Sequence, residues 1–260
     1  MQGRNLAPFF YYEVVMGVDL SVLNFIMGHK ECIKGNTLQI GRQGLHYAGS
    51  WADRTGSKAK ISNKILAEHN AEFTAEDTVN GGDGHTEKLF RMIGAETVDT
   101  IDYSPYENCT IVHDLNNPVD VSLHNRYDYI LDAGTMEHIF DVKTVIDNYK
   151  NMLKENGVIA ILTCCNNFTG HGFYQFSPEF FRTVFSKQAG YETISLHLYE
   201  LVNDESFEVY EVTEPRKGDR QEFQTSDKPH YIAFTARKMK ETFNVNYQQS
   251  DYLKVWGELV

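Results

Sequence analysis

Three carboxylates stand directly after short apolar runs in this 260-residue sequence. They are Asp102, Asp114 and Asp132, and each run has the length and composition of a β-strand. In an open α/β sheet, ligands bind beyond the carboxyl ends of the strands, and an acid there can accept hydrogen bonds from both ribose hydroxyls. An acid on the next strand can lie beside an adenine amino group. The pattern therefore favours a cofactor that contains adenosine.

The elements that position these acids alternate along the chain. Apolar runs predict strands at residues 37–40, 98–101, 110–113, 127–131 and 158–163. Helical periodicity predicts helices within residues 9–28, 59–69, 85–93 and 142–153, and Asn156-Gly157 is expected to end the last of these. Ser177-Pro178-Glu179 is typical of a further helix start. The order predicts an α/β, Rossmann-like, doubly wound and mostly parallel sheet.

The C-terminal third has a different pattern. Alternating stretches at residues 193–201, 207–212 and 231–236 predict antiparallel strands that extend the sheet. We expect a single domain over residues 1–260, with an N-terminal helical segment at 1–36.

Composition narrows the classes of partner. The net charge of −12 argues against unaided binding to nucleic acid, because an acidic surface repels phosphates. Four cysteines without zinc-ligand spacing suit a reducing compartment. The apolar run from Phe9 is interrupted by Glu13 and Asp19, so neither a signal peptide nor a membrane span is expected. We expect a cytoplasmic protein that acts on a small molecule; the sequence does not indicate its oligomeric state.

Residues 37–185 resemble the class I S-adenosylmethionine-dependent methyltransferases. The segment Ile130-Leu131-Asp132-Ala133-Gly134-Thr135-Met136-Glu137-His138 is similar to the motif after their fourth strand. The following helix and Asn156-Gly157-Val158 are similar to their passage into the fifth strand. Residues 170–179 resemble a small branch of methyltransferases encoded among surface-polysaccharide genes.

The resemblance implies S-adenosylmethionine as cofactor and assigns a part to each position. The methionine part would lie over the turn Gly41-Arg42-Gln43-Gly44. The ribose would contact Asp102 and Tyr103, and the adenine would lie between Asp114 and Leu115. The methyl-transfer site would be lined by Asp132, Ala133 and Gly134.

Two departures from the family pattern stand out. The first loop lacks the usual acid and has Arg42 between its glycines; Arg42 either grips the cofactor carboxylate or pairs with Asp83 or Glu87. About 60 residues separate Gly41 from Asp102, where roughly 20 is usual. Residues 45–83 are therefore expected to be an insertion, either a lid or a disordered excursion.

A sulfonium methyl is already activated, so alignment with the acceptor matters more than an enzyme nucleophile. If the acceptor is a hydroxyl, a base helps, and His138 and His171 are the candidates; either could instead be a structural histidine. If it is a phosphate or carboxylate oxygen, no base is needed. We expect acceptor contacts from residues near both histidines: Glu137, Asn166, Asn167, His171, Tyr174 and Gln175.

Glu137, His138 and His171 are residue types that bind metals, but adjacent residues on a loop are poorly spaced ligands, and no metal is expected. The sequence thus predicts an S-adenosylmethionine-dependent methyltransferase acting on an oxygen of a small polar acceptor. The branch resemblance implies a phosphorylated or sugar precursor in capsule or surface-polysaccharide biosynthesis. The alternatives are a non-catalytic binding protein of the same fold, a nucleotide-dependent oxidoreductase and, disfavoured by net charge, a nucleic-acid methyltransferase.

Overall fold

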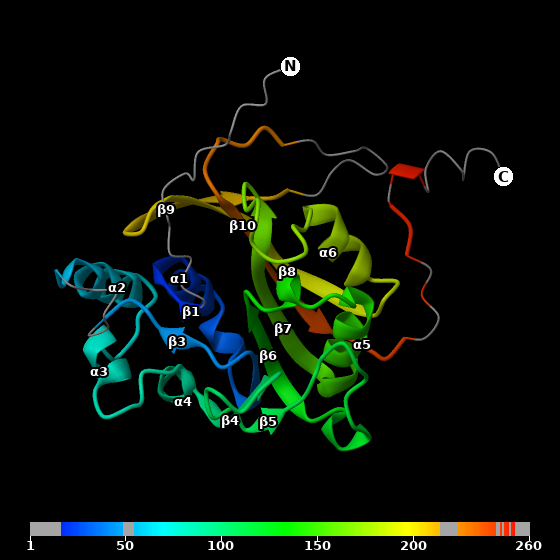
Figure 1. The fold of residues 1–260 in the computed structure, drawn as a ribbon, viewed down its shortest axis with the longest axis horizontal. Helices are drawn as coiled ribbons and strands as arrows, with labels where there is room; N and C mark the ends of the chain where they lie inside the picture. The colour runs from blue at the N-terminus through cyan, green and yellow to red at the C-terminus, as the bar shows by residue number, and fades with distance from the viewer. Residues whose placement is uncertain are drawn as a thin grey trace.

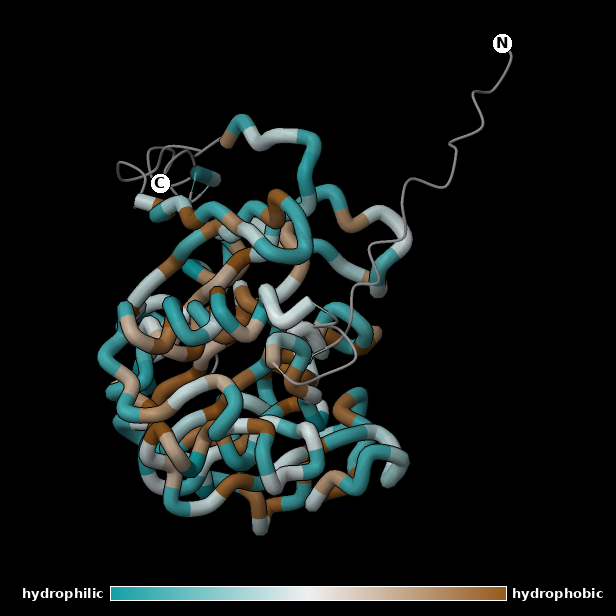
Figure 2. The backbone as a smooth tube through the Cα atoms, turned by 90° about the vertical axis from the view of Figure 1, so that its left-hand side faces the viewer, coloured by the Kyte–Doolittle hydropathy of each residue, from teal (hydrophilic) through white to brown (hydrophobic). Residues whose placement is uncertain are grey.

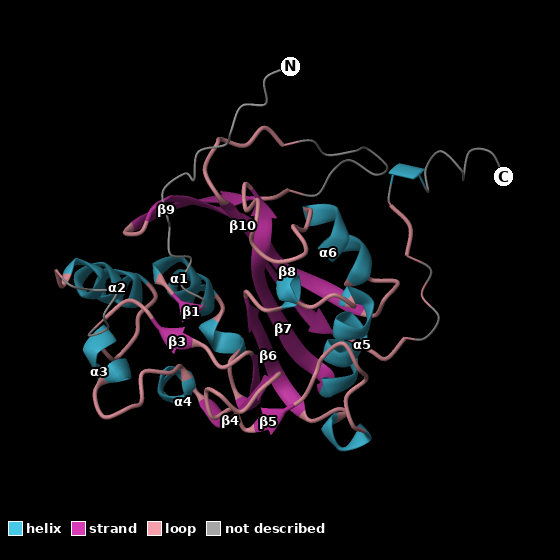
Figure 3. Cartoon of the chain, in the orientation of Figure 1, coloured by secondary structure: helices cyan, strands magenta, loops and turns pink. Residues whose placement is uncertain are grey.

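The computed structural model describes residues 17–48, 55–213, 223–242, 245, 247–249 and 251–252. A sheet of eight strands crosses the described part of the chain in the order β5-β4-β2-β6-β7-β10-β8-β9. Helices cover both of its faces, α1 to α4 on one side and α5 and α6 on the other (Figure 1). The strands accordingly lie between two helical layers (Figure 3).

The sheet has a parallel part of five strands and an antiparallel part of three strands. The parallel strands are β2 (Gly35–Ile40), β4 (Ala95–Asp102), β5 (Ile111–Val112), β6 (Tyr127–Ala133) and β7 (Leu153–Asn166). The antiparallel strands are β8 (Tyr191–Asn203), β9 (Ser206–Glu211) and β10 (His230–Lys238). A separate parallel pair joins β1 (Gly17–Val18) to β3 (Gly44–Leu45). The predicted Rossmann-like class, with antiparallel C-terminal strands, is confirmed.

The central strands are apolar on both faces, as a sheet covered by helices requires. Along β6, Tyr129 and Leu131 join the core beneath α1 and α4, whereas Ile130 joins the core beneath α5 and α6. Ile130 is aligned with Leu38 of β2 on one side and Ile159 of β7 on the other. Hydrophobic residues, drawn in brown, lie mostly within the molecule, while its outer turns are largely teal (Figure 2).

The helices begin and end largely where the sequence indicates. Their bounds are α1 (Leu20–Gly28), α2 (Ser57–Glu68), α3 (Ala75–Val79), α4 (Glu87–Ile93), α5 (Val142–Met152) and α6 (Pro178–Val184). Three 3₁₀ turns add η1 (Lys30–Cys32), η2 (Val121–Leu123) and η3 (Met136–His138). The Asp141 side chain caps α5 by accepting from the Thr144 amide. Gly94 ends α4 with a positive φ.

One predicted boundary is wrong. Helix α5 ends at Met152 rather than at Asn156-Gly157, because Leu153 already pairs with Tyr127 and opens β7. The register shift between Tyr127 and Tyr129 of β6 lies opposite residues 154–157, where Asn156 adopts a positive φ. Asn156-Gly157 therefore forms part of an irregularity within β7 and does not end the helix.

Residues 45–83 contain two helices of the N-terminal layer. The helix expected near residues 59–69 is α2, and its Ile65 and Leu66 are buried in the same core as Ala75 of α3. Residues 49–54, and the part of the first predicted helix before residue 17, lie outside the described residues. In the described part of the chain, every helix is too short or too polar to cross a bilayer.

Candidate active site

A cavity of about 290 Å³ opens at the carboxyl ends of β2, β4, β5 and β6. Seven of the residues predicted to bind the cofactor line it: Gly41, Arg42, Gln43, Asp102, Tyr103, Asp114 and Leu115. His138 lines it too. Six further lining residues were not predicted from the sequence: Ile101, Glu107, His113, Asn116, Thr135 and Ile139. Most of these directly adjoin predicted strand ends, and that position was the signal available.

The turn after β2 forms one wall of the cavity. Gly41 has a φ of 73° and donates its amide to the Ile101 carbonyl at 2.8 Å. A Cβ atom at this position would lie 2.7 Å from the Thr135 hydroxyl, so both the backbone angle and the space favour glycine. Thr135 in turn donates to the Ile40 carbonyl at 2.8 Å. The turns after β2 and β6 are thereby joined.

The Arg42 guanidinium is held by acidic side chains and by a backbone carbonyl. Its guanidinium pairs with Glu87 at 2.6 Å and Asp83 at 2.5 Å, and it also donates to the Glu107 carbonyl. Of the two alternatives for Arg42, the structure therefore shows the ion pairs. Its backbone amide remains in the site and donates to Asp102 at 3.3 Å. Gly44 does not line the cavity but belongs to β3.

Two of the three strand-end acids face this cavity. Asp102 ends β4, and its carbonyl accepts the His113 amide from the neighbouring β5 turn at 2.8 Å. Asp114 accepts from the backbone amide of Asn116 at 3.0 Å and from its side chain at 2.8 Å. These hydrogen bonds hold the pKa of Asp114 below its ordinary value. With Glu107, the cavity has three acids on its wall.

The third acid lies elsewhere. Asp132 is fully buried and does not line the cavity. Its carboxylate accepts from the amides of Thr135 at 2.8 Å and Met136 at 3.1 Å and from the Tyr149 hydroxyl at 2.7 Å. Burial raises the pKa of Asp132 to about 6, although these hydrogen bonds favour its charged form. Asp132 thus closes the turn from β6 into η3.

The neighbours of Asp132 are equally withdrawn from the cavity. Ala133 is buried, and Gly134 adopts a φ of 91° to turn the chain. Neither residue lines the cavity. The surface after β6 comes instead from Thr135, His138 and Ile139, because the turn folds Asp132 inward.

The two candidate bases lie together. The rings of His138 and His171 meet edge to face, with centroids 4.7 Å apart. Burial lowers the pKa of both imidazoles, and that of His138 is lowered further by His171. His138 borders the cavity, whereas His171 is not among its lining residues. The buried Nε2 of His138 has no hydrogen-bond partner among the described residues.

Five of the side chains expected to contact the acceptor already make hydrogen bonds within the protein: Glu137, Asn166, Asn167, Tyr174 and Gln175. Glu137 is fully buried, and its pKa is raised to about 7, first by burial and then by the charge of Asp132. The Asn166 and Asn167 amides bind residues 225–228. Tyr174 donates to the Phe140 carbonyl at 2.7 Å, and Gln175 accepts from the Phe168 amide at 3.0 Å. These bonds fix loops around the site.

Comparison with known proteins gives only distant likenesses. No family model and no curated protein matches the chain. Matching solved structures include a candidate methyltransferase from Bacillus halodurans C-125, at 11% identity over 86% of this chain and 100% of that chain, with a TM-score of 0.46. Another is the 1,6-didemethyltoxoflavin-N1-methyltransferase of Burkholderia thailandensis, at 12% identity over 85% of this chain and 78% of that chain, with a TM-score of 0.45. TM-scores this low identify neither a common fold nor a common activity, and the architecture rests on the strand order and pairing.

Proposed function

We propose that this chain is an S-adenosylmethionine-dependent methyltransferase that acts on an oxygen of a small polar acceptor. The observation that carries the proposal is the placement of Asp102 and Asp114. Asp102 is the last residue of β4, and Asp114 follows the adjacent parallel strand β5 by two residues. Both line one cavity beside the Gly41 turn. A nucleoside spanning the two strand ends would meet one carboxylate at its ribose and the other beside its base.

The charge of the cavity supports a cationic cofactor. Asp102, Glu107 and Asp114 line it, whereas the single arginine on its wall is neutralised by two ion pairs. S-adenosylmethionine has a sulfonium, an ammonium and a carboxylate, so its net charge is positive. A cavity lined by acids attracts such a ligand and repels one with several phosphates.

The turn after β2 argues against the nicotinamide alternative. Dinucleotide-binding folds hold the pyrophosphate at a helix N-terminus that directly follows a glycine-rich turn. Here the turn from Gly41 leads into β3 (Gly44–Leu45), and α2 begins only at Ser57. Among the described residues, no helix N-terminus therefore follows this turn directly to hold a pyrophosphate.

His138 is the group best placed to serve the acceptor. When bound, S-adenosylmethionine supplies a methyl group that leaves its sulfur with the bonding electron pair remaining on sulfur. A hydroxyl acceptor that forms the new C–O bond must lose its proton. The lowered pKa of His138 keeps its imidazole neutral near pH 7, so it can accept that proton. His171 packs against the ring and holds its orientation.

For the acceptor we propose a sugar or phosphorylated precursor of a surface polysaccharide. The support is the resemblance of residues 170–179, which place His171 beside His138. A cytoplasmic location belongs to the same proposal, because all four cysteines are free thiols.

Calorimetry tests the cofactor directly. S-adenosylhomocysteine should bind the full chain with one site, while reduced nicotinamide dinucleotide should show no change in fluorescence. If the chain binds the dinucleotide but does not bind S-adenosylhomocysteine, the proposal is overturned.

A panel of free sugars, sugar phosphates and nucleotide sugars, assayed for release of S-adenosylhomocysteine, then tests the acceptor. With the acceptor found, His138→Ala should slow turnover on the order of a hundredfold and leave cofactor affinity nearly unchanged.

A further inference from the structure

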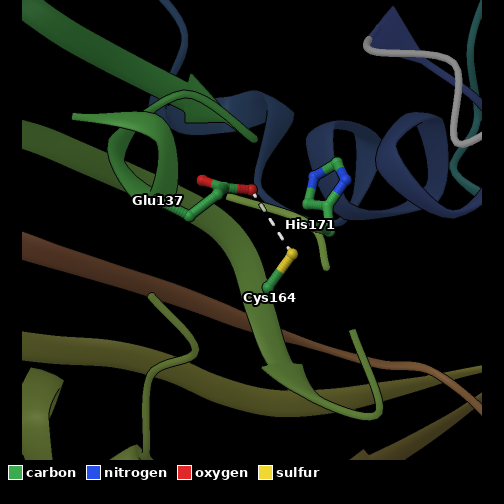
Figure 4. A group of neighbouring side chains, drawn as sticks. All are labelled: Glu137, Cys164 and His171. Atoms are coloured by element: carbon green, nitrogen blue, oxygen red, sulfur yellow. Dashed lines mark hydrogen bonds between the residues drawn. The ribbon is translucent and has the colours of Figure 1, made fainter. Parts of the chain in front are cut away.

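Three side chains of different types meet next to His138, and none of them lines the cavity. Glu137 comes from η3, Cys164 from the end of β7, and His171 from the loop after β7 (Figure 4). One ligand atom from each lies within 4.8 Å of the others. Glu137 and Cys164 are fully buried, and His171 is partly buried.

Their spacing suits a single small cation. The Cys164 sulfur lies 3.5 Å from Oε1 of Glu137. A tetrahedral Zn²⁺ ion, with bonds of about 2.3 Å to sulfur and 2.0–2.2 Å to oxygen, holds two such ligands about 3.6 Å apart. The three ligand atoms lie within 4.8 Å of one another, so His171 would have to move closer to the other two to reach the same separation. It lies between Gly170 and Gly172, both at positive φ, in a loop outside the helices and strands.

The surroundings of Glu137 already resemble those of a metal ligand. Its second oxygen, Oε2, accepts from the Thr163 hydroxyl at 2.8 Å. That bond orients the carboxylate and leaves Oε1 directed toward Cys164. Groups that hold a ligand in this way are a usual part of metal sites.

Charge provides a second argument. The largest charge effect on buried Glu137 comes from another buried acid, Asp132. Burying two carboxylates together is costly unless a cation compensates them. A divalent ion held by a carboxylate, a thiolate and a neutral imidazole forms a neutral group. The thiol proton, and any proton on the carboxyl group, would leave to solvent on binding.

We propose that Glu137, Cys164 and His171 bind a Zn²⁺ ion. The mixture of sulfur, nitrogen and oxygen ligands suits zinc better than magnesium or calcium, which take oxygen ligands. Three protein ligands leave a fourth position open. The ring of one of these ligands, His171, contacts the ring of His138. The expectation that the chain binds no metal came from the poor spacing of Glu137 and the two histidines, and from cysteines whose spacing to one another does not suit zinc. Cys164, 27 residues away from Glu137, supplies a ligand that local spacing could not reveal.

Cobalt titration tests the site without any methyl acceptor or cofactor. The full chain, free of affinity tags and stripped with a chelator, is titrated with Co²⁺ and then with Zn²⁺. One equivalent of Co²⁺ should produce a thiolate-to-cobalt charge-transfer band, and Zn²⁺ should remove it. Cys164→Ser should abolish the band, whereas the neighbouring Cys165→Ser should keep it.

His171→Gln provides the second variant, because its loop position spares the core. It should weaken Zn²⁺ binding by about tenfold to a hundredfold, while circular dichroism shows an intact fold. If Cys164→Ser does not fold, the proposal is tested by the wild-type charge-transfer band and by the Zn²⁺ affinity of His171→Gln. A wild-type chain without the band, or unchanged Zn²⁺ affinity in His171→Gln, would overturn the proposal. Binding of S-adenosylhomocysteine is measured separately, so a failure of the Zn²⁺ proposal does not contradict the proposed methyl transfer.

Discussion

The ends of β4 and β5 differ from the end of β6 in what their acids contact. Asp102 and Asp114 line the cavity. Asp132 is the second-last residue of β6 in the same sheet, but it is fully buried and accepts three internal hydrogen bonds. One residue type at one topological position thus serves as part of a binding surface in one region and as part of the core in the other.

The difference arises from the segment that each strand leads into. After β4 and β5 the chain enters loops, so the carboxylates stay at the surface of the cavity. After β6 the chain turns at once into η3, whose first amides point back at Asp132. The Tyr149 hydroxyl of α5 donates a third hydrogen bond to the same carboxylate. Position at a strand end therefore does not by itself identify a ligand-binding acid.

The largest effect should come from removing the buried acid. Asp132→Ala leaves two amides and a hydroxyl without their acceptor in the core, which should lower the free energy of unfolding by about 3–5 kcal/mol. Asp102→Ala should lower it by less than about 1 kcal/mol, since Asp102 accepts a single long bond from the Arg42 amide. Urea denaturation of both variants measures the difference, and equal losses would contradict the comparison.

Titration should separate the two kinds of acid next. In carboxyl-labelled protein, NMR should show Asp132 titrating near pH 6 and Asp114 below its ordinary pKa, more than about two pH units apart. The two acids contribute to the stability of the fold in opposite pH ranges. Asp132 holds its proton in the folded state between about pH 4 and 6, so its contribution is present at low pH and lost as pH rises through 6. That of Asp114 is present above its ordinary pKa and lost as pH falls below it. Overlapping titrations would refute the assignment.

Cofactor affinity should depend on the cavity acids. Asp102→Ala should weaken binding of S-adenosylhomocysteine by about 1–3 kcal/mol, because the ribose hydroxyls would lose their acceptor. Asp147→Ala is the matched control: this exposed acid of α5 pairs with Lys143 on the same helix and does not line the cavity. Calorimetry on the two variants gives the comparison, and equal affinities would remove Asp102 from the proposed site.

The smallest effect concerns two glycines with almost the same backbone angle. Gly41 and Gly56 have φ values of 73° and 72°, but a Cβ atom would meet Thr135 only at Gly41. Both alanine variants bear the cost of a positive φ. Gly41→Ala should therefore lower the free energy of unfolding by about 1 kcal/mol more than Gly56→Ala. Equal losses in thermal or urea unfolding would show that the turn tolerates a side chain.

Local patterns were enough to predict most of the fold and part of the site. The apolar runs identified the strands, so Asp102 and Asp114 could be assigned to one edge of the sheet. The burial of Asp132 depends on Tyr149, which lies 17 residues further along on another element. Such long-range partners leave no trace in local spacing.

Alternatives that a sequence leaves open can depend on one fold contact. Arg42 had both a cofactor carboxylate and nearby acids as plausible partners, and the position of α4 beside the turn decides for Glu87. Cys164 lies in an apolar run of β7 and is fully buried. Glu137 is brought next to it only by the pairing of β6 with β7. Strand order thus created the cluster that composition could not show.

The position of β10 has a consequence for how the protein is made. This late strand lies between β7 and β8 and pairs with both, so the two earlier strands are joined into one sheet only when it is in place. During synthesis the strands that carry the cavity emerge and can assemble first. The sheet stays open at the edge of β7 until Lys238 has left the ribosome, and a chain that stops short of it would present that edge to other chains.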